Sequence, residues 1–282
     1  MIRTAITQFG DLPNVQVVDV PDFEIGPLRT LTTALDTIQN EEALICPVDL
    51  LISSDAIGKI KDQHLSHDNS MVTLAVDSVA TSGSIVSIDS HGRVLGVQKE
   101  VEDAESLVKS AMFMVTSVGF VEYCETALSS GSTTAVSVLN DIIQKGHSVI
   151  SYTVCEKWFD LDTISDVLAA NRYLLESGTV HYPGAIFIPS GDTMEIGDTL
   201  NLASGIELGK GVSLNGPCLI NRESAIGTNC VIGPYTSMGV RTQVGDKCEI
   251  QNAVISGQSK IPNHRKFSDF LMNDSEIFRM EE

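Results

Sequence analysis

Two aspartates in this sequence stand where a metal-dependent reaction on phosphate could be supported. Asp49 closes the apolar run 44–48, and Asp160 follows soon after a second apolar run, Ser148–Val154. If both runs are strands of one open α/β sheet, both carboxylates lie at the carboxyl ends of strands, where such sheets bind ligands. Mg²⁺ favours one or two carboxylates together with substrate phosphates, and it neutralises charge during transfer at phosphorus. The pair therefore predicts a Mg²⁺ site at one edge of the sheet.

A third carboxylate near this pair has a competing role. Asp162 directly precedes a predicted helix, Thr163–Leu175, and either Asp162 or Thr163 could cap that helix by accepting a hydrogen bond from a free backbone amide. Trp158, two residues before Asp160, is expected to be a packing anchor beside the metal aspartate.

The cysteines and histidines indicate buried thiols and surface imidazoles. The six cysteines form no CxxC pair, which is typical of reduced thiols in a cytosolic protein. Cys230 and Cys248 are 18 residues apart and are expected to stack about one strand spacing from each other. The histidines at positions 64, 67, 91 and 147 lie in polar helix or turn contexts and are expected at the surface.

The composition excludes two classes of partner. The chain has 282 residues, enough for two domains, and 43% of them are hydrophobic. Its net charge of −19 repels phosphate backbones and anionic lipid, so neither nucleic acid nor membrane is an expected partner. The sequence opens without a hydrophobic signal segment, and we expect a cytoplasmic location.

The first half alternates predicted strands and helices, which indicates an α/β layer with a mainly parallel sheet. The predicted strands are Val15–Val20, Ala43–Val48, Met71–Val76, Ala111–Val115 and Ser148–Val154, with a hairpin formed by Ser84–Ile88 and Arg93–Val97. The predicted helices are Leu28–Ile38, Ser53–His67, stretches within Ser117–Leu128 and Ala135–Lys145, and Thr163–Leu175.

The second half has a different rhythm, with an apolar residue at every sixth position. The row is Ile196, Leu202, Leu208, Leu214, Ile220, Ile226, Ile232, Met238, Val244 and Ile250. Period six fits neither a helix nor a flat strand, and it is the hexapeptide repeat of a parallel β-helix. Each apolar residue is expected to point inward, and three hexads close one triangular coil. The predicted domains are therefore 1–178, an α/β domain; 183–262, the β-helix; and 263–282, a tail whose last part, Asn273 to Glu282, is polar.

Several segments resemble the sugar-phosphate nucleotidyltransferases, and they occur in that family's order. The run Trp158-Phe159-Asp160-Leu161-Asp162-Thr163, with Asp166 and Ala170-Asn171-Arg172-Tyr173-Leu174-Leu175, resembles the family's W-x-D-[IV]-[GD]-T-x-x-D…A-N-x-x-L-L pattern. The run 44–49 resembles its metal-binding strand, and Gly26-Pro27-Leu28 resembles the start of a helix beside the nucleotide. The hairpin 85–94 also resembles a family segment, and a left-handed hexapeptide β-helix is a common appendage of these enzymes.

This resemblance implies an NDP-sugar pyrophosphorylase fold, which is a partial, Rossmann-like nucleotidyltransferase domain followed by a left-handed parallel β-helix. It implies that a sugar 1-phosphate attacks the α-phosphorus of a nucleoside triphosphate and that pyrophosphate leaves. Asp49 and Asp160 would hold Mg²⁺. Gly26, Pro27 and Leu28 would lie beside the nucleotide. Gln98 and Lys99, which stand where the family has E-K-P, would contact the sugar phosphate.

The sequence also departs from the family. The Gly-rich G-G-x-G-[ST]-R-L loop that cradles the triphosphate is missing, so we expect a truncated or impaired transferase. The alternative is a non-catalytic regulatory or scaffold relative. A β-helix acyltransferase is disfavoured, because such enzymes use a histidine on the coils and none occurs between His181 and His264. Stacked coils present flat faces, so we expect a homo-oligomer or a hetero-oligomer with an active relative.

Overall fold

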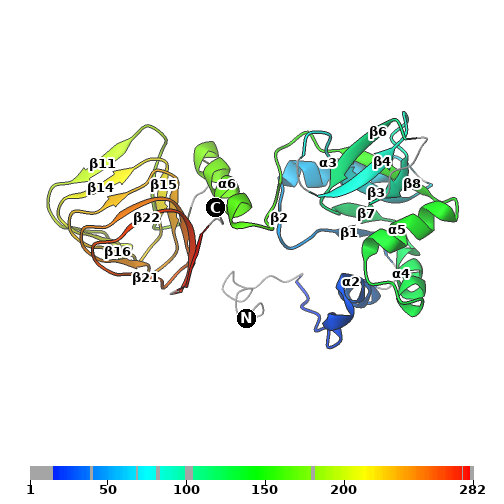
Figure 1. The fold of residues 1–282 in the computed structure, drawn as a ribbon, viewed down its shortest axis with the longest axis horizontal. Helices are drawn as coiled ribbons and strands as arrows, with labels where there is room; N and C mark the ends of the chain where they lie inside the picture. Colours follow the sequence, from blue (N-terminus) through cyan, green and yellow to red (C-terminus); the bar gives the residue numbers. More distant parts are fainter. Residues whose placement is uncertain are drawn as a thin grey trace. The chain divides into compact units, whose positions relative to one another are not determined.

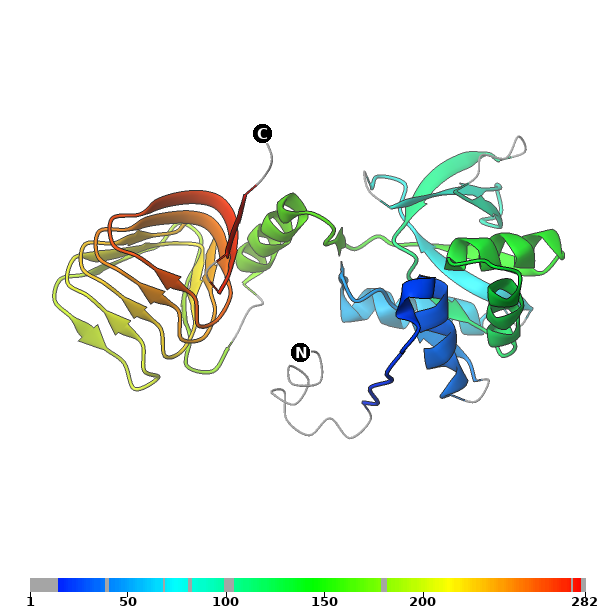
Figure 2. The ribbon, with the colours of Figure 1, turned by 60° about the horizontal axis from the view of Figure 1, so that its bottom comes forward.

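The chain folds as two units with separate hydrophobic cores, Met1–Trp158 and Phe159–Glu282. The computed structural model describes residues 15–38, 41–67, 69–80, 83–98, 104–178, 182–274 and 276–279. Figure 1 and Figure 2 trace the elements of each unit by colour. Among the described residues, no helix has the length and apolar character needed to cross a membrane.

The first unit is an α/β structure built on a sheet of strand order β1-β7-β3-β8. β1, β3 and β8 run in one direction and β7 runs in the other, so the sheet is mainly parallel, as the alternating pattern predicted. A second, three-stranded sheet has the order β5-β4-β6. The elements are η1 (Phe23–Ile25), α2 (Pro27–Asp36), β1 (Ala43–Ile45), β2 (Leu50–Leu51), α3 (Ser54–Leu65), β3 (Ser70–Val76), β4 (Ser84–Ile88), β5 (Val94–Val97), β6 (Ser106–Ser110), β7 (Met114–Thr116), α4 (Phe120–Ser129), α5 (Ala135–Gln144) and β8 (Ser148–Thr153).

Side chains alternate across β3 and divide the core between the two faces of the sheet. Val72, Leu74 and Val76 face a cluster that α2, α4 and α5 complete, and Figure 2 shows these helices together on one side. Ala75 faces a second cluster, to which α3 contributes Ala56 and Ile60. Apolar side chains on both faces of one strand explain why Met71–Val76 is an almost continuous hydrophobic run.

Three details of the first unit differ from the sequence-based expectations. Val15–Val20 is not a strand, because β-branched residues form a strand only where the backbone has a neighbour to pair with. β6, Ser106–Ser110, was not predicted, since polar and apolar residues do not alternate clearly along it. β7 begins at Met114, three residues later than expected, after Met112 adopts a positive φ of 60°.

The second unit consists of helix α6 (Ile164–Ser177) and a β-helix of left-handed hexapeptide type. Short strands stack into three faces. The short strand β9 (Phe159–Asp160) precedes α6 and is not part of these faces. The strands of the β-helix are β10 (Ile186–Ile188), β11 (Thr193–Ile196), β12 (Leu200–Asn201), β13 (Glu207–Leu208), β14 (Val212–Asn215), β15 (Cys218–Ile220), β16 (Ala225–Ile226), β17 (Val231–Ile232), β18 (Thr236–Met238), β19 (Gln243–Val244), β20 (Glu249–Ile255), β21 (Lys260–Ile261), β22 (Lys266–Asn273) and β23 (Glu276–Arg279).

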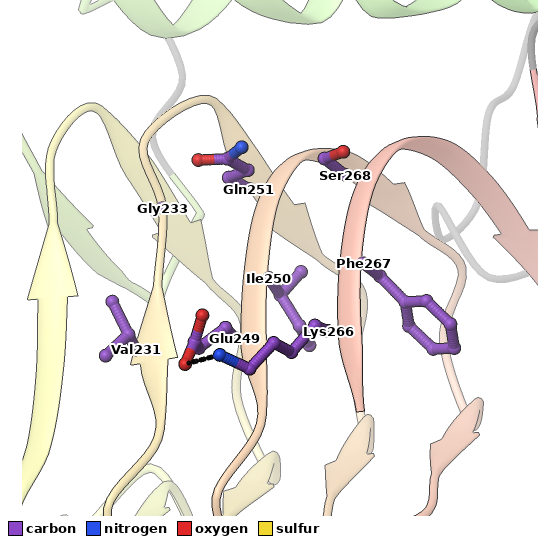
Figure 3. Close-up of a pocket in the computed structure, with 8 residues that line it drawn as sticks. All are labelled: Val231, Gly233, Glu249, Ile250, Gln251, Lys266, Phe267 and Ser268. Carbon is purple, nitrogen blue, oxygen red and sulfur yellow. Dashed lines mark ion pairs between the residues drawn. The ribbon is translucent and has the colours of Figure 1, made fainter. Parts of the chain in front are cut away.

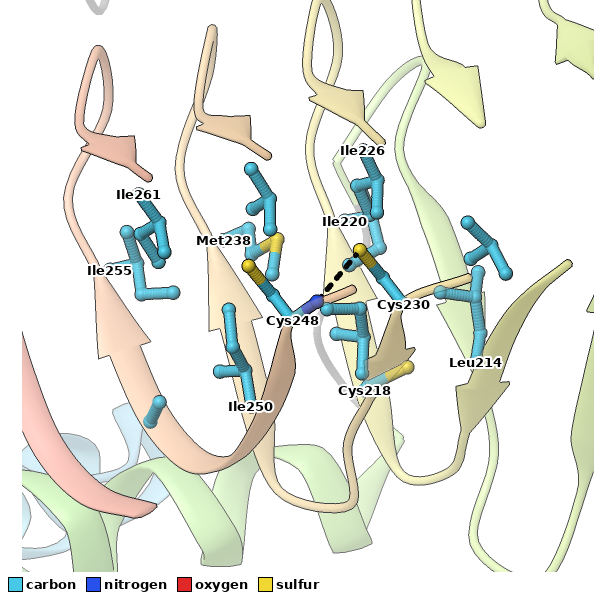
Figure 4. Packing of buried hydrophobic residues seen from close by; sticks show 14 of the residues in the cluster. Leu214, Cys218, Ile220, Ile226, Cys230, Met238, Cys248, Ile250, Ile255 and Ile261 are labelled. Atoms are coloured by element: carbon cyan, nitrogen blue, oxygen red, sulfur yellow. Dashed lines mark hydrogen bonds between the residues drawn. The ribbon is translucent and has the colours of Figure 1, made fainter. Parts of the chain in front are cut away.

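The inward row predicted from the period of six is confirmed. Nine of its ten residues are buried and the tenth, Leu202, packs against the same core. Figure 4 labels several residues of this row, among them Leu214, Ile226 and Ile250, and shows Cys230 and Cys248 on neighbouring coils. The amide of Cys248 donates to the sulfur of Cys230 at 3.3 Å, and burial raises the pKa of the Cys230 thiol to about 11. Both cysteines therefore act as small packing residues.

The first coil runs in the opposite direction to the rest. β10, β11 and β12 pair antiparallel with β15, β14 and β13, and the chain reverses through a turn at Gly205, whose φ is 78°. The parallel stack therefore begins at β13, later than the predicted start at 183. The period of six survives the reversal because every face needs one inward residue whichever way the chain runs.

One corner of the later coils is shorter by one residue. Leu214 pairs with Ile232, 18 positions on, but Val244 pairs with Ile261 and Ile250 with Phe267, 17 positions on. β20 passes straight through this corner, and Asn252 supplies the positive φ of 45°. The row of six thus ends at Ile250 although the coils continue through β22, and β23 then folds back antiparallel. The region 263–282, which was expected to be a tail, contributes β22 to the stack and β23 to its antiparallel edge.

Candidate functional site

The carboxyl ends of β1, β3 and β8 lie at one edge of the first unit's sheet, because the three strands run the same way. The residues that follow them are rich in carboxylates. Asp49 follows β1, Asp77 follows β3, and Glu156 follows β8. This edge is where an open α/β sheet binds a ligand, and it is the candidate site of the first unit.

Asp49 is exposed four residues beyond the end of β1. Its nearest titratable neighbour in sequence is Cys46. Burial, and secondarily the negative charge of Asp49, raises the pKa of the Cys46 thiol. The thiol is thus held in its protonated form, which makes it a poor nucleophile and a poor metal ligand.

The other predicted metal ligand belongs to the second unit. Asp160 ends β9 and is half-buried, and one of its carboxylate oxygens lies within 4.8 Å of an oxygen of Asp162. Since Asp49 and Asp160 belong to different units, a site shared by the two stays a prediction. Asp162 remains available as a ligand because Thr163 caps α6, in a capping box with Asp166. The helix-cap role considered for Asp162 is therefore filled by Thr163.

Glu156 and Lys59 form the principal ion pair at this edge. The ammonium of Lys59, on α3, lies 2.5 Å from Glu156 and 2.8 Å from Asp55. Hydrogen bonds to these two carboxylates raise the pKa of Lys59, and the bond from Lys59 lowers the pKa of Glu156. Lys59 is therefore committed to two carboxylates, which limits what it can offer to an incoming phosphate.

Asp77 is a residue of this edge that sequence reasoning missed. Its Oδ2 accepts a hydrogen bond from the indole Nε1 of Trp158 at 2.8 Å. The signal was present, because Asp77 directly follows the run Met71–Val76 just as Asp49 follows an apolar run. Trp158 packs in the cluster of α3 and β7, which agrees with its predicted role as a packing anchor.

Gly26, Pro27 and Leu28 form the start of α2, as expected, but this start is occupied by the protein itself. The amide of Leu28 donates to the carbonyl of Thr133 at 2.9 Å. A Cβ on Gly26 would lie 2.9 Å from the same carbonyl oxygen, and Gly26 has a φ of 132°. The glycine thus permits the loop between α4 and α5 to pack here, and the nucleotide-binding role of these three residues stays a prediction.

Of the two residues predicted to contact the sugar phosphate, the structure describes only Gln98. Gln98, which follows β5, has a positive φ of 50°, and its side-chain amide donates to Ser84 Oγ at 3.1 Å. Lys99 lies outside the described residues. Their contact with a sugar phosphate stays a prediction.

The Asn171-Arg172 part of the quoted motif has a structural role. Asn171 is buried between α6 and the coils, where its amide donates to the Tyr235 carbonyl at 3.0 Å and its oxygen accepts from Ser237 at 2.6 Å. Arg172 donates to Asn252 at 2.9 Å and lies over the Tyr235 ring. These residues attach α6 to the β-helix, so in this chain they contribute to packing.

His64 differs from the surface position expected for it. It is 3% exposed, on the face of α3 that packs against the sheet. Its Nδ1 lies 2.8 Å from Thr73 Oγ1 and its Nε2 lies 3.1 Å from Ser117 Oγ. Burial lowers the pKa of this imidazole. The helical context predicted the element correctly but gave no information about which face would be covered.

A groove of about 230 Å³ crosses the outer surface of the β-helix, between the rows of β17, β20 and β22. Figure 3 shows the ammonium of Lys266 reaching Glu249, and the ion pair measures 2.6 Å. Gly233 lines this groove, and its position requires glycine because a Cβ there would clash with the Asn215 carbonyl oxygen. The groove's cation is neutralised by its own neighbour, which disfavours a phosphate-binding role.

No family model matches the sequence, and no curated protein matches it. Two solved structures are similar over part of the chain. The inositol-1-phosphate CTP transferase from T. maritima has a TM-score of 0.45 and 15% identity, covering 53% of this chain and 61% of that one. A protein from Bacillus anthracis assigned as a glucose-1-phosphate thymidylyltransferase, in complex with a sucrose, has a TM-score of 0.46 and 12% identity, covering 56% and 63%. The chain spans about three fifths of each structure's length. At these scores the likeness says nothing of activity.

Proposed function

We propose that this chain is a sugar-1-phosphate nucleotidyltransferase with impaired activity. A phosphate oxygen of the sugar 1-phosphate attacks the α-phosphorus of a nucleoside triphosphate, and the bond to the β-phosphate breaks, which releases pyrophosphate. The observation that carries the proposal is the close pair of carboxylates, Asp160 and Asp162, within the segment that resembles the family pattern.

The donor set fits the cation that this chemistry needs. Carboxylate oxygens are hard ligands, and two oxygens within 4.8 Å of each other can both contact one hydrated Mg²⁺. In the proposed arrangement Asp160 and Asp162 hold the ion, and Asp49 joins them. When bound, Mg²⁺ would supply charge neutralisation across the phosphates. The residues' own contribution is to position and orient the reactants.

The second candidate function, a non-catalytic regulatory or scaffold relative, is favoured by a specific observation. Lys59 is already bonded to two carboxylates, and the Leu28 amide at the start of α2 is bonded to Thr133. Neither the Lys59 ammonium nor the Leu28 amide is therefore free to bind the phosphates of a nucleoside triphosphate. We therefore expect binding without rapid turnover.

Calorimetry with a panel of nucleoside triphosphates, with and without Mg²⁺, tests the proposal, together with pyrophosphate release in the presence of sugar 1-phosphates. We expect Mg²⁺-dependent binding that Asp160→Asn removes and that Asp62→Asn, an exposed carboxylate on α3, leaves intact. If no triphosphate binds in a Mg²⁺-dependent manner, the proposal is wrong. A turnover near a typical enzyme value, on the order of 10 s⁻¹, would contradict the proposal that the activity is impaired.

We also propose that the β-helix mediates self-association or association with an active relative, because its stacked strands present flat faces. Light scattering tests the self-association. A solution mass above the 30.3 kDa of one chain supports it, and a monomer at concentrations of about 100 μM, far above typical obligate-dimer constants, rules it out.

A further inference from the structure

A hydrogen bond joins the end of β3 to the protein's only tryptophan, Trp158. Asp77 Oδ2 accepts from the indole, and Asp77 Oδ1 accepts from the amide of Val79 at 2.8 Å. The backbone of Asp77 is fixed as well, since its amide and carbonyl exchange hydrogen bonds of 2.8 and 2.9 Å with Lys109. The carboxylate is thus a rigid acceptor, and a charged acceptor makes a stronger hydrogen bond than a neutral one.

Apolar packing alone does not fix the orientation of this indole. Trp158 is half-buried in the cluster of α3 and β7, where it lines a small hollow together with Leu50, Phe113 and Val154. Packing of this kind is non-directional, whereas the indole N–H has a single direction and needs an acceptor there. Asp77 provides that acceptor and so selects one orientation of the ring.

The orientation matters because Trp158 begins the segment that carries the proposed metal ligands. Asp160 is two residues further on, so the two Cα atoms are at most about 7.6 Å apart. The other end of the segment is fixed at Thr163, whose amide and hydroxyl both donate to Asp166. Phe159 and Asp160 form the short strand β9, so the run 159–162 consists of this strand and two further residues, and it lies between Trp158 on one side and the capping box on the other.

We infer that Asp77 is a positioning residue, which acts through Trp158 to hold the Asp160 carboxylate where it binds a divalent cation. The inference rests on the proposed function, since it requires a cation at Asp160. In this proposal Asp77 acts as a hydrogen-bond acceptor and not as a ligand, since its two carboxylate oxygens accept from Val79 and Trp158 within the first unit. Neighbours that orient a metal ligand commonly change metal affinity by about 10- to 100-fold when they are removed.

Mn²⁺ is a suitable probe, because it takes the same oxygen ligands and quenches the fluorescence of a nearby indole. With the full-length chain, Mn²⁺ should quench Trp158 saturably, and Asp160→Asn should remove the saturable part. Asp77→Ala should raise the Mn²⁺ midpoint about tenfold, and Asp77→Asn, which keeps one acceptor oxygen, by about threefold or less. Asp62→Asn is the matched control and should leave the midpoint unchanged.

A double-mutant cycle separates positioning from a general loss of stability. In the Trp158→Phe background the indole is absent, so adding Asp77→Ala should change the Mn²⁺ dissociation constant by less than about twofold, as measured by calorimetry. A merely structural Asp77 would instead weaken binding equally in both backgrounds. Circular dichroism at the binding temperature shows whether each variant is folded, and Asp77→Asn serves if Asp77→Ala does not fold.

The failures are distinguishable. If the parent protein shows no saturable Mn²⁺ binding, the metal site of the proposed function is absent and the inference falls with it. If the parent binds Mn²⁺ and Asp77→Ala binds it equally well, the proposed function stands and the inference alone is overturned. Equal losses in both backgrounds of the cycle also overturn it.

Discussion

The two units of this chain hold their residues in place by different means. In the β-helix, each coil repeats the contacts of the coil before it, so Ile226 makes the same kind of contact as Leu208 above and Val244 below. In the α/β unit, polar contacts occur once and join distant parts of the chain, such as Asp77 with Trp158, 81 positions apart. Repetition makes a contact visible in the sequence, and a single long-range contact leaves no pattern.

The comparison also predicts how the two units fail. A coil has neighbours above and below it, and stability passes along the stack through nearest-neighbour contacts. A single inward substitution should therefore propagate along the β-helix, whereas the α/β unit should lose stability at the one junction that is changed.

Replacing an inward residue with a charge should have the largest effect. Ile226 is 3% exposed in the middle of the stack, and Ile226→Asp places a carboxylate there without a partner. We expect a loss of more than about 4 kcal/mol and unfolding of the coils, seen as loss of β-sheet circular dichroism. Val231→Asp, at an outward position, is the control and should cost less than about 1 kcal/mol. Similar effects of the two changes would contradict the inward row.

Gly26→Ala should have the next largest effect, confined to the α/β unit. Its φ of 132° suits only glycine, and the new Cβ would lie 2.9 Å from the Thr133 carbonyl oxygen. We expect a loss of about 1–3 kcal/mol in chemical denaturation. Gly58→Ala is the matched control, because Gly58 lies within α3 with nothing near its Cβ position. That change should stabilise the unit by up to about 1 kcal/mol. If Gly26→Ala left the free energy of unfolding unchanged, the contact between Gly26 and Thr133 would have to be mobile enough to admit the Cβ.

The sequence predicted the β-helix to the level of single side chains, and the reason is physical. Every coil needs one inward apolar residue per face, so the period of six is imposed by geometry. The same reason explains what the period could not show. The period does not depend on the direction of the chain, so it did not reveal that the first coil is antiparallel to the next. It ended at Ile250 because one corner of the later coils is one residue shorter.

For the α/β unit the sequence predicted most elements and fewer of the contacts. Strand-end positions singled out Asp49 but not Asp77, and the helical context of His64 did not reveal that this side chain is buried. The Asn171-Arg172 pair was quoted as part of a catalytic family's pattern, yet its contacts attach α6 to the coils. Burial and pairing of such residues depend on elements far away in the sequence, which local pattern does not encode.

Asn171→Ala should weaken the attachment of α6 to the β-helix by a smaller amount. The change leaves the Ser237 hydroxyl and the Tyr235 carbonyl without their partner in a partly buried setting. Since an unsatisfied, fully buried polar group costs about 1–3 kcal/mol, we expect a loss near the lower end of that range. Hydrogen exchange of α6 amides should accelerate, while exchange in the central coils stays slow. Ser165→Ala, an exposed position on the same helix, is the control. Unchanged exchange in α6 would mean that apolar contacts suffice for the attachment.

The smallest effect should depend on pH and arise from the buried imidazole of the α/β unit. Ser117 donates to the Ser70 carbonyl, so its oxygen is free to accept from His64 Nε2, and Nδ1 accepts from Thr73. This pattern fits a neutral ring. Burial holds the folded-state pKa of His64 below the ordinary value of 6.5. As the pH falls below 6.5, the unfolded chain takes up a proton that the folded unit excludes, so stability is complete above this pH and declines below it.

The decline can reach about 1.4 kcal/mol for each pH unit between 6.5 and the lowered folded-state pKa. Denaturation midpoints of the α/β unit between pH 7.5 and 5 should therefore fall more steeply in the parent protein than in His64→Gln, which has no imidazole to protonate. Nuclear magnetic resonance of the His64 ring gives a direct check. Titration of the folded protein near 6.5 would show that the ring is accessible to water and that its contacts with Thr73 and Ser117 do not exclude a proton.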